Sequence, residues 1–127
     1  MSEYWGYHLI LDAAGCNLES ISSKENIDAF ARDLVKKIDM VAYGDPQVIH
    51  FGSGNKLGYT LVQLIETSNI CAHFVEENST FYLDVFSCKP FEPEIVIETA
   101  KAYFNFLKYN VAYVERQAPK LDDEHTE

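Results

Sequence analysis

The stretch that decides the fold, residues 60–88, reads TLVQLIETSNICAHFVEENSTFYLDVFSC. Two β-prone apolar runs bound it, Tyr59 to Glu66 and Ser79 to Ser87. Ser68 and His73 stand between these runs, with cysteines nearby in the sequence. Side chains capable of catalysis that cluster beside strands indicate a functional site, whereas residues that only pack in the core need not cluster in this way. The stretch therefore predicts a functional site centred on Ser68.

The segment before this stretch adds a hairpin. Gln47 to Phe51 reads as a strand that follows a turn at Gly44-Asp45-Pro46. The loop from Gly52 to Gly58 joins it to the strand that begins at Tyr59. The glycines of this loop have neither the Walker spacing nor the G-x-G-x-x-G pattern of a phosphate-binding loop. We therefore expect a connection between two antiparallel strands here.

The last strand of the stretch has two distinct faces. Because side chains alternate along a strand, every second residue from Thr80 to Cys88 lies on one face. These residues are Thr80, Tyr82, Asp84, Phe86 and Cys88. This face therefore carries polar and aromatic groups and ends at a cysteine.

Two amphipathic helices are predicted, one on each side of the stretch. The first is capped by Ser22 or Ser23, and Lys36 and Lys37 near its end suit the helix dipole. The second begins at Pro93 and stops at Asn110. Apolar residues recur at steps of three and four in both. The stripes are Ile27, Phe30, Ala31, Leu34, Val35 and Ile38 in the first helix and Ile95, Thr99, Ala102, Tyr103 and Phe106 in the second.

The predicted order of elements is β, α, β, β, β, α, β, with outer strands at Tyr7 to Asp12 and Val111 to Val114. This order lacks regular β-α-β alternation. It predicts an α+β fold, a two-layer sandwich with a largely antiparallel sheet and two helices on one face. Residues 1–117 are expected to form a single domain, and residues 118–127 an acidic flexible tail.

The second face of such a sheet needs a cover. Strand-associated aromatic residues could form a self-complementary interface, which makes a homodimer the expected assembly. The same rings could instead fill the core. They are Tyr4, Trp5, Tyr7, Tyr59, Phe81 and Tyr82.

The composition narrows the class of partner. The chain of 127 residues has a formal net charge of -10, which repels nucleic acids and anionic membranes and attracts cationic substrates. Neither nucleic acid nor a membrane is therefore an expected partner. The chain shows no secretion signal and no apolar run of membrane-spanning length. Three cysteines without a CxxC pair favour reduced thiols, so a cytoplasmic protein is expected.

A metal centre is not expected. His8 and Cys16 could be combined with His73 and Cys88 as a ligand set. No chelate spacing supports such a set.

Three blocks of the sequence resemble one known family. They are residues 6–17, GYHLILDAAGCN, residues 67–73, TSNICAH, and residues 83–88, LDVFSC. With the order of elements and Val114-Glu115-Arg116 near the end, they resemble the short prokaryotic S-adenosylmethionine decarboxylases. The resemblance extends over most of the chain. Members of this family cleave themselves to make a pyruvoyl cofactor.

The resemblance implies a role for each of four side chains. A serine followed by a histidine five residues on and a cysteine twenty residues on is a combination specific to the family. It implies that Ser68 is the pyruvoyl precursor, His73 the processing base and Cys88 the catalytic proton donor. Thr60 would help to stabilise the processing intermediate.

The chemistry of these groups explains the pattern. The Ser68 hydroxyl can attack the Thr67 carbonyl and form an ester through an oxyanion that a hydroxyl such as that of Thr60 could stabilise. An imidazole can then remove the α-proton of residue 68, and hydrolysis leaves a pyruvoyl group. A thiol can return a proton to the substrate after CO2 departs. No external cofactor is implied, and cleavage leaves a β chain of residues 1–67 and an α chain of residues 68–127.

The resemblance also implies a substrate. S-adenosylmethionine is favoured, which implies a role in polyamine synthesis and substrate contacts from Phe51, Ile70 and Glu77. Three residues depart from the family pattern: Thr67 stands where glutamate is usual, Asn69 where histidine is usual, and Val75 where an aromatic pocket wall is usual.

Some members of the superfamily act on ornithine or arginine instead, and this is the alternative. Such a substrate would need a carboxylate for its distal cation, for which Glu76, Glu77 and Asp84 are candidates. An uncleaved homologue with a binding role is a further alternative. The sequence leaves these alternatives open, together with activation by putrescine.

Overall fold

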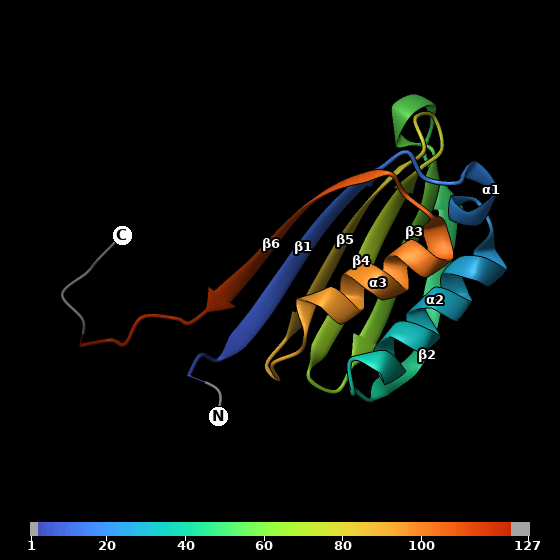
Figure 1. Cartoon of the computed structure of the whole chain (residues 1–127). Coiled ribbons are helices and arrows are strands. Elements are labelled where there is room, and N and C mark those ends of the chain that lie inside the picture. The colour runs from blue at the N-terminus through green and yellow to red at the C-terminus, as the bar shows by residue number, and fades with distance from the viewer. Residues whose placement is uncertain (1–2, 123–127) are drawn as a thin grey trace.

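A six-stranded antiparallel sheet forms one layer of the structure, a computed structural model in which residues 3–122 are described. Its strands are β1 Gly6–Ala14, β2 Ala42–Phe51, β3 Gly58–Ile65, β4 Ser68–Val75, β5 Thr80–Ser87 and β6 Lys108–Arg116. The helices are α1 Leu18–Ile21, α2 Lys24–Lys37 and α3 Pro93–Phe104, with a 3₁₀ turn at Gly54–Lys56. The strand order is β2-β3-β4-β5-β1-β6. Because α2 and α3 lie against one face of this sheet (Figure 1), the predicted α+β two-layer sandwich is confirmed.

The two long helices begin and end where local chemistry favours it. The Ser23 side chain caps α2 by accepting a hydrogen bond from the Asn26 N–H at 3.1 Å. Pro93 occupies the first turn of α3, where its missing N–H costs nothing. That helix ends where Asn105 adopts a left-handed conformation with φ of 53°. The predicted stop at Asn110 is therefore wrong, because Asn110 lies in β6.

Two elements are present that the sequence patterns do not predict. One is the short helix α1, and the other is the strand β4, which occupies the centre of the predicted site. Alternate side chains of β4, Ile70, Ala72 and Phe74, are buried beneath the helices. Since β3 and β5 pair with its two edges, β4 is a central strand of the sheet.

The predicted turn at Gly44-Asp45-Pro46 is instead an irregularity within β2. The strand continues through it, and its register with β3 shifts between Tyr43 and Gln47. Gly44 has a φ of 77°, which few other residues adopt. Pro46 is tolerated because β2 is an edge strand with one unpaired side.

The core between sheet and helices is centred on the Phe104 ring. Its centroid lies 4.9 Å from that of Phe30 on α2, 5.0 Å from Phe74 on β4 and 5.2 Å from Phe81 on β5. Phe104 itself is fully buried. One side chain therefore joins both long helices to the two central strands.

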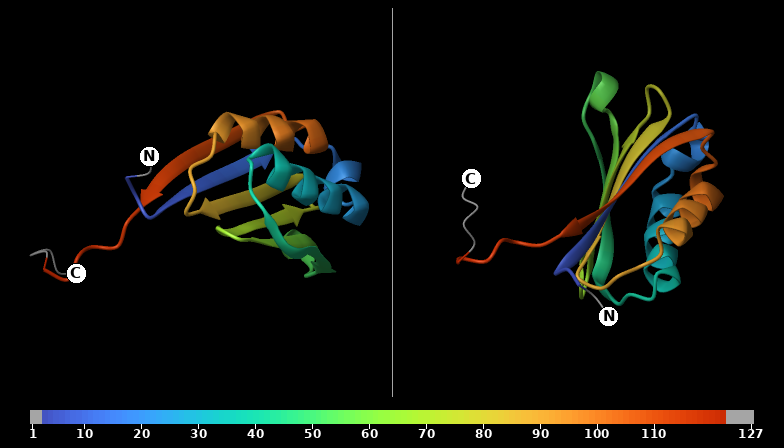
Figure 2. Two further views of the ribbon diagram at one scale, coloured as in Figure 1. Left: turned by 90° about the horizontal axis from the view of Figure 1, so that it is seen from below. Right: turned by 60° about the vertical axis from the view of Figure 1, so that its left-hand side comes forward.

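The opposite face of the sheet has no second layer within the described residues (Figure 2, right). The register places Ile49, Phe51, Leu64, Tyr82 and Val114 on this face, and all five are exposed apolar or aromatic residues. We call it the open face.

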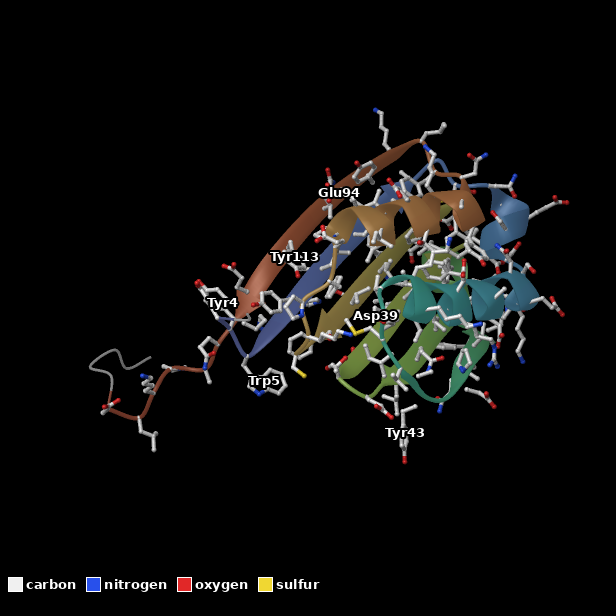
Figure 3. All side chains as sticks on the ribbon, turned by 60° about the horizontal axis from the view of Figure 1, so that its bottom comes forward. Tyr4, Trp5, Asp39, Tyr43, Glu94 and Tyr113 are labelled. Atoms are coloured by element: carbon white, nitrogen blue, oxygen red, sulfur yellow. The ribbon has the colours of Figure 1, made fainter. Side chains whose placement is uncertain are left out.

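The aromatic residues that suggested an interface are divided between the two environments. Tyr7 and Phe81 lie in the core, at 8% and 1% exposure, whereas Tyr82 and Trp5 are 43% and 60% exposed. Figure 3 shows Trp5 and Tyr43 projecting outward from the ribbon. Some of these rings therefore fill the core, and others are exposed on the surface; the predicted interface stays a prediction.

The chain leaves the sheet after β6. Residues 117–122 are exposed and have no regular secondary structure, while residues 123–127 of the predicted tail lie outside the described part. No helix among residues 3–122 is both long enough and apolar enough to cross a membrane.

Replacing the central ring should destabilise the fold strongly. Phe104→Ala should lower the free energy of unfolding by about 3–5 kcal/mol, because the cavity would border four elements. Leu107→Ala is the matched control: Leu107 is 80% exposed, so the change should stay within about 0.5 kcal/mol. Urea titration at fixed protein concentration measures both values, and a loss below about 1 kcal/mol for Phe104→Ala would contradict this picture.

Candidate functional site

A two-residue turn, Glu66-Thr67, joins β3 to β4 at one end of the sheet. The residues on either side of it, Ile65 and Ser68, are partners in the antiparallel register. Ser68 is also the partner of Ser87 on β5. The predicted precursor residue is therefore the first residue of a central strand, directly after a tight turn.

The carbonyl group of Thr67 is held by the end of β5. Its oxygen accepts a hydrogen bond from the Cys88 N–H at 3.0 Å. The Thr67 hydroxyl accepts a second hydrogen bond, from the Ser87 hydroxyl at 2.8 Å. The peptide bond between Thr67 and Ser68 is thus held by Ser87, the last residue of β5, and by the backbone of the next residue, Cys88.

Thr60 and His73 form a second group, further along the sheet. They are partners in the register of β3 and β4, and Thr60 Oγ1 lies 3.3 Å from His73 Nδ1. A cavity of about 500 Å³ is lined by both, together with Phe51, Tyr59 and Tyr82. Polar groups and aromatic rings therefore meet in one concave part of the open face.

The two groups are separate within one chain. Five residues of strand span about 16 Å, so His73 cannot contact Ser68 along β4. An odd spacing also places these two side chains on opposite faces of the sheet. Thr60 lies across from His73, so the chain does fold back after Thr60, as its predicted role requires, but this brings Thr60 to His73 and not to Ser68.

The remaining predicted site residues are placed as follows. Phe51 lines the cavity with His73. Ile70 is fully buried on the helix side of the sheet, so its side chain faces away from the cavity. Glu77 is exposed in the turn between β4 and β5, next to the cavity residue Asn78. Only the backbone of Ile70 could therefore contact a substrate in the cavity.

Two histidines contact two of the three carboxylates that are candidates to bind a distal cation. His50 Nε2 lies 2.8 Å from Glu76 Oε2, and His8 Nε2 lies 3.0 Å from Asp84 Oδ1. Asp84 is also the register partner of Cys71. Burial raises the pKa of the Cys71 thiol, and the Asp84 carboxylate raises it further.

The third cysteine is held away from both groups. The Cys16 N–H donates to the Ser79 carbonyl, at the end of β5 opposite to Cys88. Burial raises the pKa of the Cys16 thiol to about 11, which keeps it protonated near neutrality. Among residues 3–122, no three His, Cys, Asp or Glu side chains gather as a metal site would require.

Ser87 is the site residue that the sequence patterns miss. Its side chain is fully buried and bonded to Thr67. The signal was present in the alternation of apolar residues at 70, 72 and 74, which marks β4 as a strand. A strand at that place would have paired its first residue with the end of β5.

Comparison with known proteins identifies the family. The family model described as S-adenosylmethionine decarboxylase matches residues 7–117. The S-adenosylmethionine decarboxylase proenzyme of Clostridium botulinum (strain Hall) is 26% identical over 115 residues, which cover 90% of this chain and 96% of that protein. That of Sulfurihydrogenibium sp. (strain YO3AOP1) is 30% identical over 106 residues, or 80% of this chain and 77% of that protein.

A solved structure supports the fold. The adenosylmethionine decarboxylase from Aquifex aeolicus VF5 aligns with a TM-score of 0.78 at 20% identity, over 98% of this chain and 100% of that chain. The family model covers most of the chain, and the fold agrees with that of the solved structure. The chain therefore belongs to the S-adenosylmethionine decarboxylase family and is a decarboxylase.

Proposed function

We propose that this chain is a proenzyme that cleaves itself between Thr67 and Ser68 and then decarboxylates S-adenosylmethionine in polyamine biosynthesis. One observation carries the proposal: the carbonyl that Ser68 must attack already accepts a hydrogen bond from the Cys88 N–H, at 3.0 Å. A backbone donor aimed at this oxygen would stabilise the negative charge that develops there during attack. The names of the relatives as proenzymes support the same reading.

The self-cleavage uses only groups of the chain and water. The Ser68 hydroxyl attacks the Thr67 carbonyl carbon, the C–N bond breaks, and its nitrogen takes the proton, which leaves an ester and a free amine. A base then removes the α-proton of residue 68, and the ester C–O bond breaks to release the Thr67 carboxylate. Water replaces the nitrogen of the resulting dehydroalanine, with loss of ammonia.

Residue 68 is well placed to carry the resulting pyruvoyl group. It begins a central strand that β3 and β5 hold on both sides, so the new chain end stays in the sheet. Cys88 stands beside it, because its neighbour Ser87 is the register partner of Ser68. The pyruvoyl group, once formed, accepts the electrons released as the substrate loses CO2. The Cys88 thiol, on the residue whose N–H contacts the Thr67 carbonyl, is the proposed proton donor.

A second copy of the chain would complete the site. His73, the proposed base, lies about 16 Å along the strand from Ser68, which is too far for proton transfer. Both His73 and exposed apolar side chains such as Ile49 and Phe51 lie on the open face. Packing two open faces together would bury these side chains and could bring His73 of one copy to the backbone of residue 68 in the other. The α-proton of residue 68 is the group that His73 must remove, whereas the Ser68 side chain lies on the helix side of the sheet. The proposed active unit is therefore a homodimer.

The cavity beside His73 favours S-adenosylmethionine over ornithine or arginine. The rings of Phe51 and Tyr82 on the open face offer stacking surfaces to a planar base. Lys56 also lines the cavity, and no carboxylate does among the described residues. A dibasic amino acid would meet a like charge there and no partner for its distal cation. The alternative substrates are therefore less well matched to this cavity.

Self-cleavage predicts two fragments, residues 1–67 and residues 68–127, after incubation of the purified protein. Denaturing electrophoresis and intact mass measure them. The mass of the fragment 68–127 should be lower, by the mass of one ammonia, than that of the same peptide beginning with serine. This difference distinguishes self-cleavage from proteolysis. Ser68→Ala should stay a single species. A wild-type chain that remains whole after prolonged incubation would instead identify an uncleaved homologue.

The substrate is tested by CO2 release from S-adenosylmethionine, ornithine and arginine in parallel. We expect release from S-adenosylmethionine alone; preferential release from ornithine or arginine would assign the alternative. Cys88→Ala should still cleave, because the backbone N–H remains, but turnover should fall about 100-fold or more. Cys16→Ala is the matched control, since Cys16 lies at the other end of the sheet, and should turn over normally. Equal turnover rates in the two variants would show that Cys88 is not the proton donor.

The composite site is tested by mixing two inactive chains. Ser68→Ala and His73→Ala should each remain whole when expressed alone. When they are co-expressed with different tags, the His73→Ala chain should be cleaved, because its intact Ser68 meets the His73 of the other copy. The Ser68→Ala chain should stay whole in the same sample. Absence of cleavage in a co-purified mixed dimer would show that a single chain must supply both groups.

A further inference from the structure

A chain of hydrogen bonds runs from the end of β5 to the Thr67 side chain. The Lys89 N–H donates to the Ser87 hydroxyl at 3.0 Å, and that hydroxyl donates to Thr67 Oγ1 at 2.8 Å. The Thr67 hydroxyl in turn lies 3.3 Å from the sulfur of Met40, to which it donates. Ser87 is fully buried and Met40 is 8% exposed. The Thr67 hydroxyl is thus a donor and an acceptor with defined partners.

A surface contact braces the two segments that carry these groups. The Lys89 ammonium donates to the backbone carbonyl of Asp39 and lies 3.2 Å from the Asp39 carboxylate. Asp39 lies in the connection between α2 and β2 (Figure 3), next to Met40 in the sequence. The contact ties the segment after β5 to the segment after α2. The partners of Thr67 on both sides are therefore held relative to each other.

Thr67 is consequently held at two points by one short segment. Ser87 binds its side chain, and the N–H of the next residue, Cys88, binds its carbonyl oxygen. These two hydrogen bonds to one residue restrict rotation of the peptide plane between Thr67 and Ser68. Intramolecular attack depends on such restriction, because the nucleophile must reach one face of the carbonyl carbon in a narrow geometry.

We propose that the Thr67 hydroxyl, held by Ser87, is a positioning group for the self-cleavage proposed above. It orients the carbonyl of its own residue so that the oxygen points at the Cys88 N–H while the Ser68 hydroxyl attacks. Ser87 acts through Thr67 and is a positioning residue. The inference rests on the proposed function, and it explains how this chain cleaves with threonine where the family it resembles usually has glutamate.

The closing experiment follows cleavage in a cell-free translation time course, in which whole chains are made and their conversion is timed. Thr67→Val removes the hydroxyl and keeps the shape, and should slow the first-order appearance of the two fragments by about 10-fold. Thr67→Ser, which keeps the hydroxyl, should restore the rate to within about threefold of the wild type. Ser87→Ala should also slow cleavage. The double variant should be no slower than Thr67→Val, because both changes remove the same hydrogen bond between Ser87 and Thr67.

A buried threonine elsewhere supplies the matched control. Thr99 is 5% exposed, and its hydroxyl donates to the Ile95 carbonyl at 2.7 Å within α3. Thr99→Val should lower the melting temperature about as much as Thr67→Val and leave the cleavage rate unchanged. Equal cleavage rates in Thr67→Val and wild type would overturn the positioning role alone. A wild-type chain that never cleaves would overturn the positioning role and the proposed function together.

Discussion

The antiparallel register between β3 and β4, set by the two-residue turn at Glu66-Thr67, is the constraint on which the site depends. It makes Ser68 the partner of Ile65 and places His73 across from Thr60. Because β5 pairs with the other edge of β4, the same register brings Ser87 and Cys88 to the turn. A shift by one residue would move the buried side chains of β4 to the open face, so core packing maintains the geometry of the site.

Much of the fold could be predicted because its patterns are strong. The stripe of α2 has the helical period and a serine cap, and β5 alternates cleanly between buried and exposed side chains. β4 was missed because its outward residues include His73 and Cys71, which read as site chemistry instead of as the polar face of a strand. The bulge in β2 was interpreted as a turn because glycine and proline are typical of both turns and bulges. A proline is permitted within this strand because β2 lies at the edge of the sheet, which the sequence alone does not show.

The members of the site could be predicted more readily than their arrangement. Linear spacing suggested one cluster, and the structure brings Thr67, Ser68 and Cys88 to one end of the sheet while Thr60 and His73 lie further along it. The odd spacing from Ser68 to His73 already implies opposite faces, but only once β4 is known to be a straight strand. The role of Ser87 follows from the pairing of β4 with β5, so the sequence reveals it only once the alternation at 70, 72 and 74 is interpreted as a strand.

The strand order gives the proposed cleavage a consequence for the lifetime of the protein. A cut after Thr67 would leave β1, β2 and β3 on one chain and β4, β5 and β6 on the other. In the sheet these strands interleave, and the pairs β3–β4, β5–β1 and β1–β6 would each join different chains. The whole precursor folds as a unimolecular process, whereas recovery of the cut protein from unfolding would require two chains to meet again and would depend on concentration. The mature protein would therefore be assembled once, and its persistence would be governed by how slowly the interleaved sheet opens.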